Sequence, residues 1–386
     1  MAIMNAFPAG GGGGAVREIV ERTISRYQDK TITFVGSYAF AGCVDLSYVS
    51  LPQLSSVGNY AFYGCTSLES IEFPNLSTAG DSAFTGCTSL EAISLPMYTG
   101  NSKAFSGFNS TSALRYVSLP KYGSTSIPVL NAPLTHLCLG CVSIDTSFAH
   151  PETFISLVFS NLTHFSNQSG FTALEYLEIG GSTFDAYVPA WNVAAKIYSF
   201  PNLTAFTDQI SASKTEFFWN NRLKIQELYA PKLSAFKTGD NFSGWFVFGS
   251  SYTALKSVNL HNASFSYNIS SVFASCPNLE YVDITNANYV APYMFYSCSK
   301  LQNIRLEKVQ SLYGFGFGGC SKLESIYILT STVPSLSTYV FNNTPIVNST
   351  YLGRFGSIFV KSSMVNAFKT NASWASYSDR ITAYTG

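Results

Sequence analysis

The sequence repeats itself with a period of 22 residues near its N-terminus. Three segments align without a gap: VGSYAFAGCVDLSYVSLPQLSS from Val35, VGNYAFYGCTSLESIEFPNLST from Val57 and AGDSAFTGCTSLEAISLPMYTG from Ala79. The pattern returns from Val272 and from Met294. A fixed period of this length is typical of repeat proteins, in which each repeat buries its apolar face against its neighbours. We therefore expect an array of stacked coils.

The shared core of the repeat reads Ala-Phe-x-x-Cys-x-x-Leu-x-x-Ile/Val-x-Leu/Ile, often followed by Pro. In the first copy, the last three apolar positions are Leu46, Val49 and Leu51. The final two lie two residues apart, which is the period of a strand with one buried face. Prolines such as Pro52 and Pro74 follow, and they end the strand because they lack an N–H group. One short strand per repeat predicts a solenoid of the α/β class, mainly β, with a stacked parallel sheet.

We count about thirteen repeats by the first Leu of the pattern, or by the residue that replaces it. Phe154, Ala195 and Ile225 match the pattern weakly, so the register within 181–250 stays open. Because the same period occurs near both ends, one continuous solenoid is favoured over two globular domains. The markers are residues 46, 68, 90, 114, 134, 154, 174, 195, 225, 255, 279, 301 and 323.

The ends of a solenoid expose apolar edges, so they need covering segments. Residues 1–16 include five consecutive glycines and predict a flexible segment. Residues 17–34 interleave charged and apolar side chains and predict an N-terminal cap. The repeats then occupy 35–350, with degenerate copies in 125–250, and a C-terminal cap occupies 351–386.

Within the C-terminal cap, residues 358–360 predict a last strand. Ser362 and Ser363 predict the N-cap of a helix over 364–369. Trp374, Tyr377 and Ile381 are expected to cover the final coil.

These repeats resemble the BspA-like (Treponema pallidum-type) leucine-rich repeat, through the Ala-Phe-x-x-Cys-x-x-Leu-x-x-Ile-x-Leu-Pro line. The segment IFVKSSMVNAFKTNASWASYSDRITAY is similar to the closing segment of bacterial members. The resemblance covers about 35–386, and implies a right-handed superhelix with no catalytic residues to carry over. It also implies a surface-exposed or secreted protein of a host-associated bacterium, in a group that includes adhesins and prophage-encoded arrays. Residues 1–9 lack the pattern of a signal peptide, so a phage particle and the cytoplasm stay open as locations.

The composition excludes several classes of protein. The 22 basic and 22 acidic residues cancel, and only 11% of residues are charged, whereas 15% are aromatic. Intrinsic disorder needs more charge and fewer aromatic residues. A nucleic-acid partner needs a basic excess, and a membrane span needs a longer apolar run than the sequence contains. We expect a monomer that inserts into no membrane and binds no nucleic acid.

Six of the eight cysteines recur at one repeat position, which indicates a structural role. Stacked parallel side chains keep their Cβ atoms farther apart than a disulfide prefers, so we expect buried free thiols. Cys138 and Cys141 form a C-x-x-C pair near His136 and His150. A zinc site needs four convergent ligands, and the strand pattern turns His136 and Cys138 away from the core. We therefore predict neither a metal nor a cofactor.

No enzyme signature is present in the sequence. We find no G-x-S-x-G, no phosphate-binding glycine loop and no H-E-x-x-H. The four histidines, of which His261 is the last, have no carboxylate at a spacing that indicates catalysis. The chain is therefore predicted not to be an enzyme; a catalytic site would have to lie in the irregular stretch 181–250.

The strand pattern also predicts which side chains point out of the sheet. Six of these 26 outward positions hold Tyr, where the average composition would give fewer than two. Tyr, Ser and Asn with few charges are typical of antibody paratopes, although the β propensity of Tyr alone would also enrich it here. The predicted ligand-binding residues are Tyr48, Tyr116, Tyr176, Tyr229, Tyr281, Asp283, Asn303, Arg305 and Tyr327.

Two functions remain in view at this point. The first is a non-enzymatic recognition or adhesion protein whose sheet binds a protein or glycan. The alternative is a structural or receptor-binding component of a prophage particle or surface assembly, attached through the glycine-rich N-terminal segment.

Overall fold

The computed structural model describes residues 6–7, 15–16, 24–100, 102–107, 112–123, 132–141, 143–144, 148–162, 164–165, 170–184, 195–206, 224–234, 252–265, 270–347, 353 and 355–386. It forms two compact units. Unit 1 is Met1–Gly181 with Ala186–Val193, and unit 2 is Ser182–Asp185 with Ala194–Gly386. Each is described separately.

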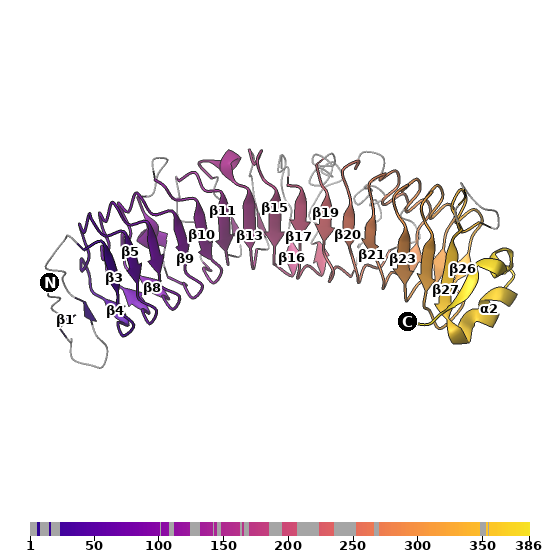
Figure 1. Ribbon diagram of the computed structural model, residues 1–386, viewed down its shortest axis with the longest axis horizontal. Coiled ribbons are helices and arrows are strands. Elements are labelled where there is room, and N and C mark those ends of the chain that lie inside the picture. The colour runs from indigo at the N-terminus through magenta and orange to yellow at the C-terminus, as the bar shows by residue number, and fades with distance from the viewer. Residues whose placement is uncertain are drawn as a thin grey trace. The chain divides into compact units, whose positions relative to one another are not determined.

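Each unit is built mainly of short parallel strands that lie side by side (Figure 1). All thirteen predicted repeat strands are present, and each begins two residues after its marker, the weak markers included. The predicted fold class is confirmed: the protein is a mainly β parallel solenoid of about twelve turns with little helix. In unit 1 the repeat strands are β5 (Tyr48–Ser50), β7 (Ser70–Glu72), β9 (Ala92–Ser94), β10 (Tyr116–Leu119), β11 (His136–Leu139), β13 (Ser156–Phe159) and β15 (Tyr176–Ile179). In unit 2 they are β17 (Ile197–Ser199), β19 (Glu227–Tyr229), β20 (Ser257–Asn259), β21 (Tyr281–Asp283), β23 (Asn303–Leu306) and β25 (Ser325–Ile328).

Shorter strands follow many of the repeat strands and form small sheets of their own. Parallel pairing joins β4 to β6 and β8 in unit 1, and β22 to β24 and β26 in unit 2. The short strands of unit 1 are β1 (Ala6–Phe7), β2 (Ala15–Val16), β4 (Phe34–Val35), β6 (Ser56–Val57), β8 (Thr78–Ala79), β12 (Ser143–Ile144) and β14 (His164–Phe165). Those of unit 2 are β16 (Thr183–Phe184), β18 (Ala205–Phe206), β22 (Tyr289–Val290), β24 (Ser311–Leu312) and β26 (Ser335–Leu336). Unit 1 also contains the 3-10 helices η1 (Ser102–Phe105) and η2 (Pro151–Thr153).

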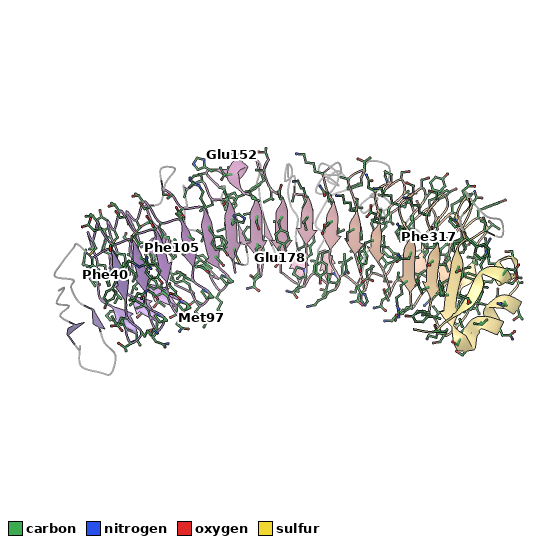
Figure 2. All side chains as sticks on the ribbon, in the orientation of Figure 1. Phe40, Met97, Phe105, Glu152, Glu178 and Phe317 are labelled. Atoms are coloured by element: carbon green, nitrogen blue, oxygen red, sulfur yellow. The ribbon has the colours of Figure 1, made fainter. Side chains whose placement is uncertain are left out.

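A column of stacked phenylalanine rings runs through the core of each unit, and Phe40, Phe105 and Phe317 of these columns are labelled in Figure 2. Rings from successive coils stack nearly parallel, with centroids 4.8–5.8 Å apart, and the side chains are buried. Such burial and stacking are the main source of stability that a repeat coil can gain from its neighbours. The columns are Phe40, Phe62, Phe84 and Phe105 in unit 1, and Phe273, Phe295, Phe317 and Phe341 in unit 2.

The repeated cysteines are free and buried, as predicted. The structure adds a reason for their position, because the thiols of Cys65, Cys87, Cys298 and Cys320 each lie close to a backbone carbonyl of the preceding coil. The Sγ of Cys65 donates to the Phe40 carbonyl at 3.0 Å, and that of Cys298 donates to the Phe273 carbonyl at 3.0 Å. Burial raises the pKa of Cys298 to about 12, so the group stays a thiol and remains a donor.

The glycine before the cysteine is needed at several turns. Gly42, Gly64 and Gly86 have φ of 70°, 69° and 82°, in the left-handed region that a side chain disfavours. A Cβ on Gly86 would also lie only 3.1 Å from the Cα of Gly64 in the preceding coil. This turn therefore allows successive coils to approach closely.

The charged segment before the first repeat contributes the strand β3 (Arg26–Gln28), which pairs in parallel with β5. Tyr27 of this strand is buried at the end of the phenylalanine column, 5.3 Å from the ring of Phe40. Residues 17–23 of the predicted cap, and the glycine run, lie outside the described residues.

The C-terminal segment closes unit 2 with two more parallel strands, β27 (Ser357–Lys361) and β28 (Ile381–Tyr384). Between them lie η3 (Ser362–Met364), α2 (Val365–Thr370) and η4 (Ala375–Arg380). The predicted strand and helix are confirmed, but the predicted serine N-cap is wrong. No side chain caps α2, because both serines lie in η3 and Met364 occupies the N-cap position, while Ser362 donates to the carbonyl of Tyr384 in the neighbouring strand.

The predicted cover of the last coil is present. Trp374 is buried, its Nε1 donates to the Pro334 carbonyl at 2.8 Å, and its ring lies against Phe341. Tyr377 meets the ring of Phe341 edge-on, and Ile381 is buried. Among the described residues, no helix has the length and apolar character needed to cross a membrane.

Candidate binding surfaces

Parallel, in-register pairing aligns the outward side chains of the repeat strands into two rows within each unit. In unit 1 one row passes through Tyr116, His136, Ser156 and Tyr176. In unit 2 the equivalent row passes through Glu227, Ser257 and Tyr281, and the second row passes through Tyr229, Asn259 and Asp283. The predicted site residues thus lie at outward positions of the sheet. His136 and Cys138 also lie outward, with Leu137 and Leu139 buried between and beside them, as predicted.

Tyr48 at the start of unit 1 is held by two neighbours, Arg26 and Glu72. The guanidinium of Arg26 lies 4.3 Å from the centre of its ring, and its hydroxyl donates to Glu72 at 2.9 Å. The Ser50 hydroxyl donates to the same carboxylate oxygen at 2.7 Å. These hydrogen bonds, that of Ser50 first and that of Tyr48 second, lower the pKa of Glu72. Tyr48 is half-buried and already engaged within the protein.

The other two predicted tyrosines of unit 1, Tyr116 and Tyr176, differ in their accessibility to a ligand. Tyr116 is exposed, with its ring 6.1 Å from the ring of His136. The Tyr176 hydroxyl donates to Glu178, a residue labelled in Figure 2. Tyr116 is therefore the more accessible of the two.

The C-x-x-C pair is split between the surface and the core. Cys138 is half-buried and Cys141 is buried, and burial raises both pKa values, that of Cys141 to about 11. The His136 Nδ1 lies 2.9 Å from the Thr135 hydroxyl. In the described part of the chain, no three His, Cys, Asp or Glu side chains converge as metal ligands would.

Unit 2 presents two well-exposed tyrosines on its sheet. Tyr229 is 43% exposed and Tyr281 is 54% exposed. Partial burial raises the pKa of Tyr281, and the negative charge of Asp283 adds to this effect. The rings project from strands whose backbone is fixed by parallel pairing on both sides of β20. They are thus large, rigid contact surfaces of the kind that proteins use for binding.

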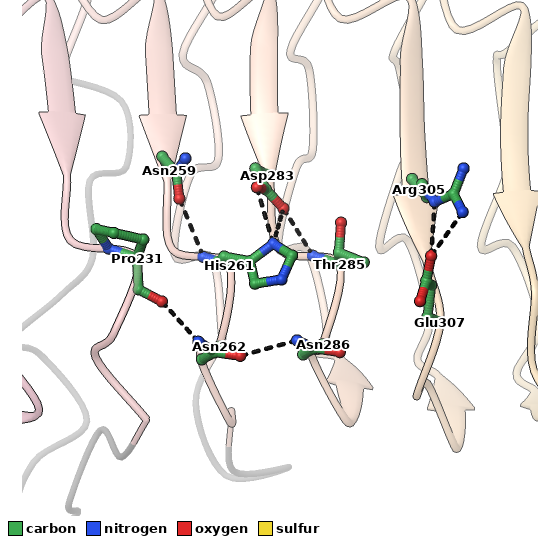
Figure 3. Close-up of polar contacts among 9 residues, drawn as sticks. All are labelled: Pro231, Asn259, His261, Asn262, Asp283, Thr285, Asn286, Arg305 and Glu307. Carbon is green, nitrogen blue, oxygen red and sulfur yellow. Dashed lines mark hydrogen bonds and ion pairs between the residues drawn. The ribbon is translucent and has the colours of Figure 1, made fainter.

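Beside these tyrosines lies a polar network at the ends of β20 and β21 (Figure 3). The His261 Nδ1 lies 3.0 and 3.1 Å from the two oxygens of Asp283, and the Thr285 amide donates to Asp283 at 3.1 Å. The Asn259 side chain accepts from the His261 amide. Asp283, a predicted site residue, is therefore fixed by its neighbours.

The pairing of His261 with Asp283 corrects the sequence analysis, which found no carboxylate at a meaningful distance from any histidine. The two residues are 22 positions apart, which is one coil of the solenoid. The repeat period was the signal that would have found the pair. It forms an ion pair when His261 is protonated.

Comparison with known families identifies the repeats. The model of the BspA type leucine rich repeat region matches residues 25–128 and 246–353 in six copies, which together exceed half of the chain. The chain belongs to the BspA-type leucine-rich repeat family. This confirms the family that the sequence resembled. BspA-type and other leucine-rich repeat proteins typically mediate protein recognition and are typically non-enzymatic.

Several solved structures are similar to this BspA-type chain. A leucine-rich repeat protein of T. pallidum is 19% identical, with 42% of this chain and 83% of that chain covered and a TM-score of 0.29. A leucine-rich cell surface protein from Faecalibacterium prausnitzii is 15% identical, covering 100% and 98%, with a TM-score of 0.25. A leucine-rich repeat protein of Leptospira interrogans is 10% identical, covering 92% and 90%, with a TM-score of 0.46. None of the curated proteins compared with the chain matches it.

The sheet of this BspA-type array continues into its C-terminal cap. Tyr327 stacks on Phe359 of β27, with centroids 4.9 Å apart, and meets Tyr384 of β28 edge-on. The Arg305 guanidinium lies 5.6 Å from the centre of the Tyr384 ring and is paired with Glu307 at 2.7 Å (Figure 3). Asn303 lies in the outward row next to that of Arg305, on the same strand, and is exposed.

Phe359 and Tyr384 were missed by the sequence analysis, which treated the cap only as a cover. Phe359 pairs in register with Tyr327, so extending the outward rows by one strand would have found it. The described outward face of unit 2 therefore ends in an aromatic cluster made of Tyr327, Phe359 and Tyr384.

Proposed function

We propose that the protein is a recognition protein that binds a protein or glycan ligand through the outward sheet face of unit 2. The observation that carries the proposal is the exposure of Tyr229 and Tyr281 on strands with Ser and Asn neighbours. Tyrosine contributes contact area at a low entropic cost, and Ser and Asn supply adaptable hydrogen bonds. The remaining predicted residues of this face, Asp283, Asn303 and Arg305, would give the ligand polar contacts at the edge of the aromatic surface.

The family supports a role outside the cytoplasm. BspA-like neighbours include a protein described as a cell surface protein, and recognition is the usual role of leucine-rich repeats. We propose that this chain acts at the cell surface or after secretion, as a monomer. In this proposal the protein acts by binding its ligand and catalyses no reaction.

Tyr229 and Tyr281 are the best pair to substitute. Tyr327 is less suitable, since its stack on Phe359 joins the repeats to the cap, and its loss would change stability as well as binding. The test compares the wild type with the double variant Tyr229→Ser/Tyr281→Ser on an array of matrix proteins and glycans. Phe34→Ser, an aromatic residue that is 41% exposed and lies in β4, outside the repeat strands, is the matched control.

The double variant should bind the protein or glycan that retains the wild type about 10- to 100-fold more weakly. This is the loss that follows when one or two aromatic hot spots are removed. Its thermal transition should stay close to that of the wild type. Binding that is unchanged in the double variant would refute the sheet as the binding face. Absence of any array ligand, with tail or assembly proteins as the only partners recovered, would favour the structural alternative.

A further inference from the structure

A second row of aromatic side chains lies on turns outside the strand sheet. In unit 2 the rings of Tyr293 and Phe315 stack with centroids 5.1 Å apart, and those of Phe315 and Tyr339 stack at 5.3 Å. Tyr296 meets Tyr293 edge-on at 5.6 Å. Tyr293 is 42% exposed and Tyr339 is 62% exposed. We refer to Tyr293, Tyr296, Phe315 and Tyr339 as the turn row.

The backbone of the turn row is unusual for aromatic residues. Tyr293, Phe315 and Tyr339 have φ of 56°, 57° and 62°, in the left-handed region that bulky side chains disfavour and Gly or Asn tolerate. The coil imposes this conformation, since Ser82 and Ser271 have φ of 55° and 60° at the equivalent positions. The left-handed backbone is therefore common to this position, whereas the side chain there varies between Ser, Tyr and Phe.

Unit 1 also has aromatic residues at this turn position. Tyr38 and Tyr60 have φ of 61° and 56°, and their rings stack with centroids 5.0 Å apart. Tyr63 meets Tyr60 edge-on, as Tyr296 meets Tyr293. An exposed, stacked aromatic row thus occurs separately in each unit.

Stability accounts for only a small part of this choice. Any residue with a Cβ atom, Ser as well as Tyr, pays about 1–2 kcal/mol in the left-handed region, so this cost does not separate the two. A stacked aromatic pair returns about 0.5–1.5 kcal/mol, a modest gain for side chains that remain as exposed as Tyr293 and Tyr339. The chain itself shows that Ser is accepted at this position. An interaction with a partner would explain why aromatic rings are placed there.

The chemistry of the turn row restricts which classes of ligand it could bind. The turns 291–298, 313–320 and 337–344 contain no Asp, Glu, Lys, Arg or His, so they offer nothing to a polyanion or polycation. They present phenol hydroxyls and ring edges at a nearly constant spacing. Equally spaced, equivalent groups suit a ligand that repeats its own groups, whereas a folded protein surface is irregular.

We propose that the turn row binds a neutral polysaccharide. A neutral sugar carries many hydroxyl groups and C–H bonds but no charge, so it can hydrogen-bond the phenol hydroxyls and pack against the ring edges of the row. A chain of such sugars would lie along the row, with successive units against successive coils. This surface is separate from the sheet face of Tyr229 and Tyr281, so its role does not depend on that of the sheet.

The test is affinity electrophoresis of the full chain in gels that contain dextran, xylan, mannan or mixed-linkage β-glucan, with heparin as the charged probe. We expect at least one neutral polymer, and not heparin, to retard the wild type. The triple variant Tyr293→Ser/Phe315→Ser/Tyr339→Ser should lose at least tenfold in affinity for that polymer. Its melting temperature should remain near that of the wild type, because Ser82 and Ser271 already occupy this turn position.

Two further variants make the result decisive. Tyr293→Asn/Tyr339→Asn keeps a residue that tolerates positive φ, and it should also lose affinity, so a folding defect of the triple variant would not hide the effect. Tyr229→Ser/Tyr281→Ser should keep its full affinity for the polysaccharide. The proposal is overturned if no neutral polymer retards the wild type, if heparin does so equally, or if the turn-row variants keep full affinity. It also fails if only the sheet variant loses affinity, an outcome that would leave the sheet function standing.

Discussion

The buried phenylalanine column and the exposed turn row of unit 2 have almost the same geometry. Phe295 and Phe317 stack with centroids 5.4 Å apart and planes 6° apart, and Tyr293 and Phe315 stack at 5.1 Å and 7°. The coil spacing sets both distances, because equivalent residues of successive coils lie one strand spacing apart. The difference is burial: Phe295 is fully buried, whereas Tyr293 is 42% exposed. Stacking geometry alone therefore does not tell a stabilising residue from a surface residue in a solenoid.

The largest expected effect comes from removing one ring of the buried column. Phe295→Ala should lower the free energy of unfolding, measured in urea, by about 3–5 kcal/mol, because it leaves a cavity between two stacked rings. Tyr293→Ser, two residues earlier in the same turn, should lower it by only about 1 kcal/mol, because the exposed ring loses stacking but leaves no buried cavity, and Ser adopts the same left-handed backbone at Ser271. Equal losses in the two variants would contradict the division between core and surface.

The cysteine ladder should give an intermediate effect. Cys298→Ala removes a thiol that donates to the Phe273 carbonyl and fills part of the core, so the free energy of unfolding should fall by about 1–2 kcal/mol. Cys138→Ala, at a half-buried outward position, is the matched control and should cost less.

Alkylation gives a second measure of the same difference. Burial raises the pKa of Cys298, so iodoacetamide should modify this thiol only after unfolding. Rapid modification of Cys298 in the folded protein would show that the ladder is open to solvent.

The repeat strands could be predicted because their signal is local. A pair of apolar residues two apart survives even where the marker Leu is replaced, as in β17 after Ala195 and β19 after Ile225, and both strands begin where expected. The two gaps of 30 residues change the length of the coil, but they do not change the pairing register of β17, β19 and β20.

The contacts that escaped prediction are those between coils. His261 and Asp283 meet only because one coil returns the chain to the next strand, and Ser362 prefers a strand carbonyl to the helix N-terminus for the same reason. The role of Tyr293 was not predicted, because the sequence does not show that this turn residue has a positive φ. Residues one repeat apart should therefore be compared before local motifs are sought.

The smallest expected effect lies on the sheet face of unit 1, at the exposed carboxylate of Glu72. The Ser50 and Tyr48 hydroxyls lower the pKa of Glu72, so the folded state holds its proton less tightly than the unfolded state does. The contribution to stability is thus present above the ordinary pKa of a Glu side chain and is lost as the pH falls through the lowered value. Full exposure of the carboxylate keeps this contribution small.

Ser50→Ala should raise the pKa of Glu72 toward its ordinary value, as measured by an NMR titration of its side-chain carboxyl carbon. Tyr48→Phe should raise it by less, because the Ser50 hydrogen bond is the larger cause. Ser257→Ala, at an outward serine of unit 2, should leave the titration of Glu72 unchanged. If Tyr48→Phe also leaves it unchanged, the Tyr48 hydroxyl does not hold the carboxylate, and only the Arg26 guanidinium engages the Tyr48 ring. That result would extend the proposed binding face to unit 1, whereas the expected shift would confine it to tyrosines that have no carboxylate to hold them.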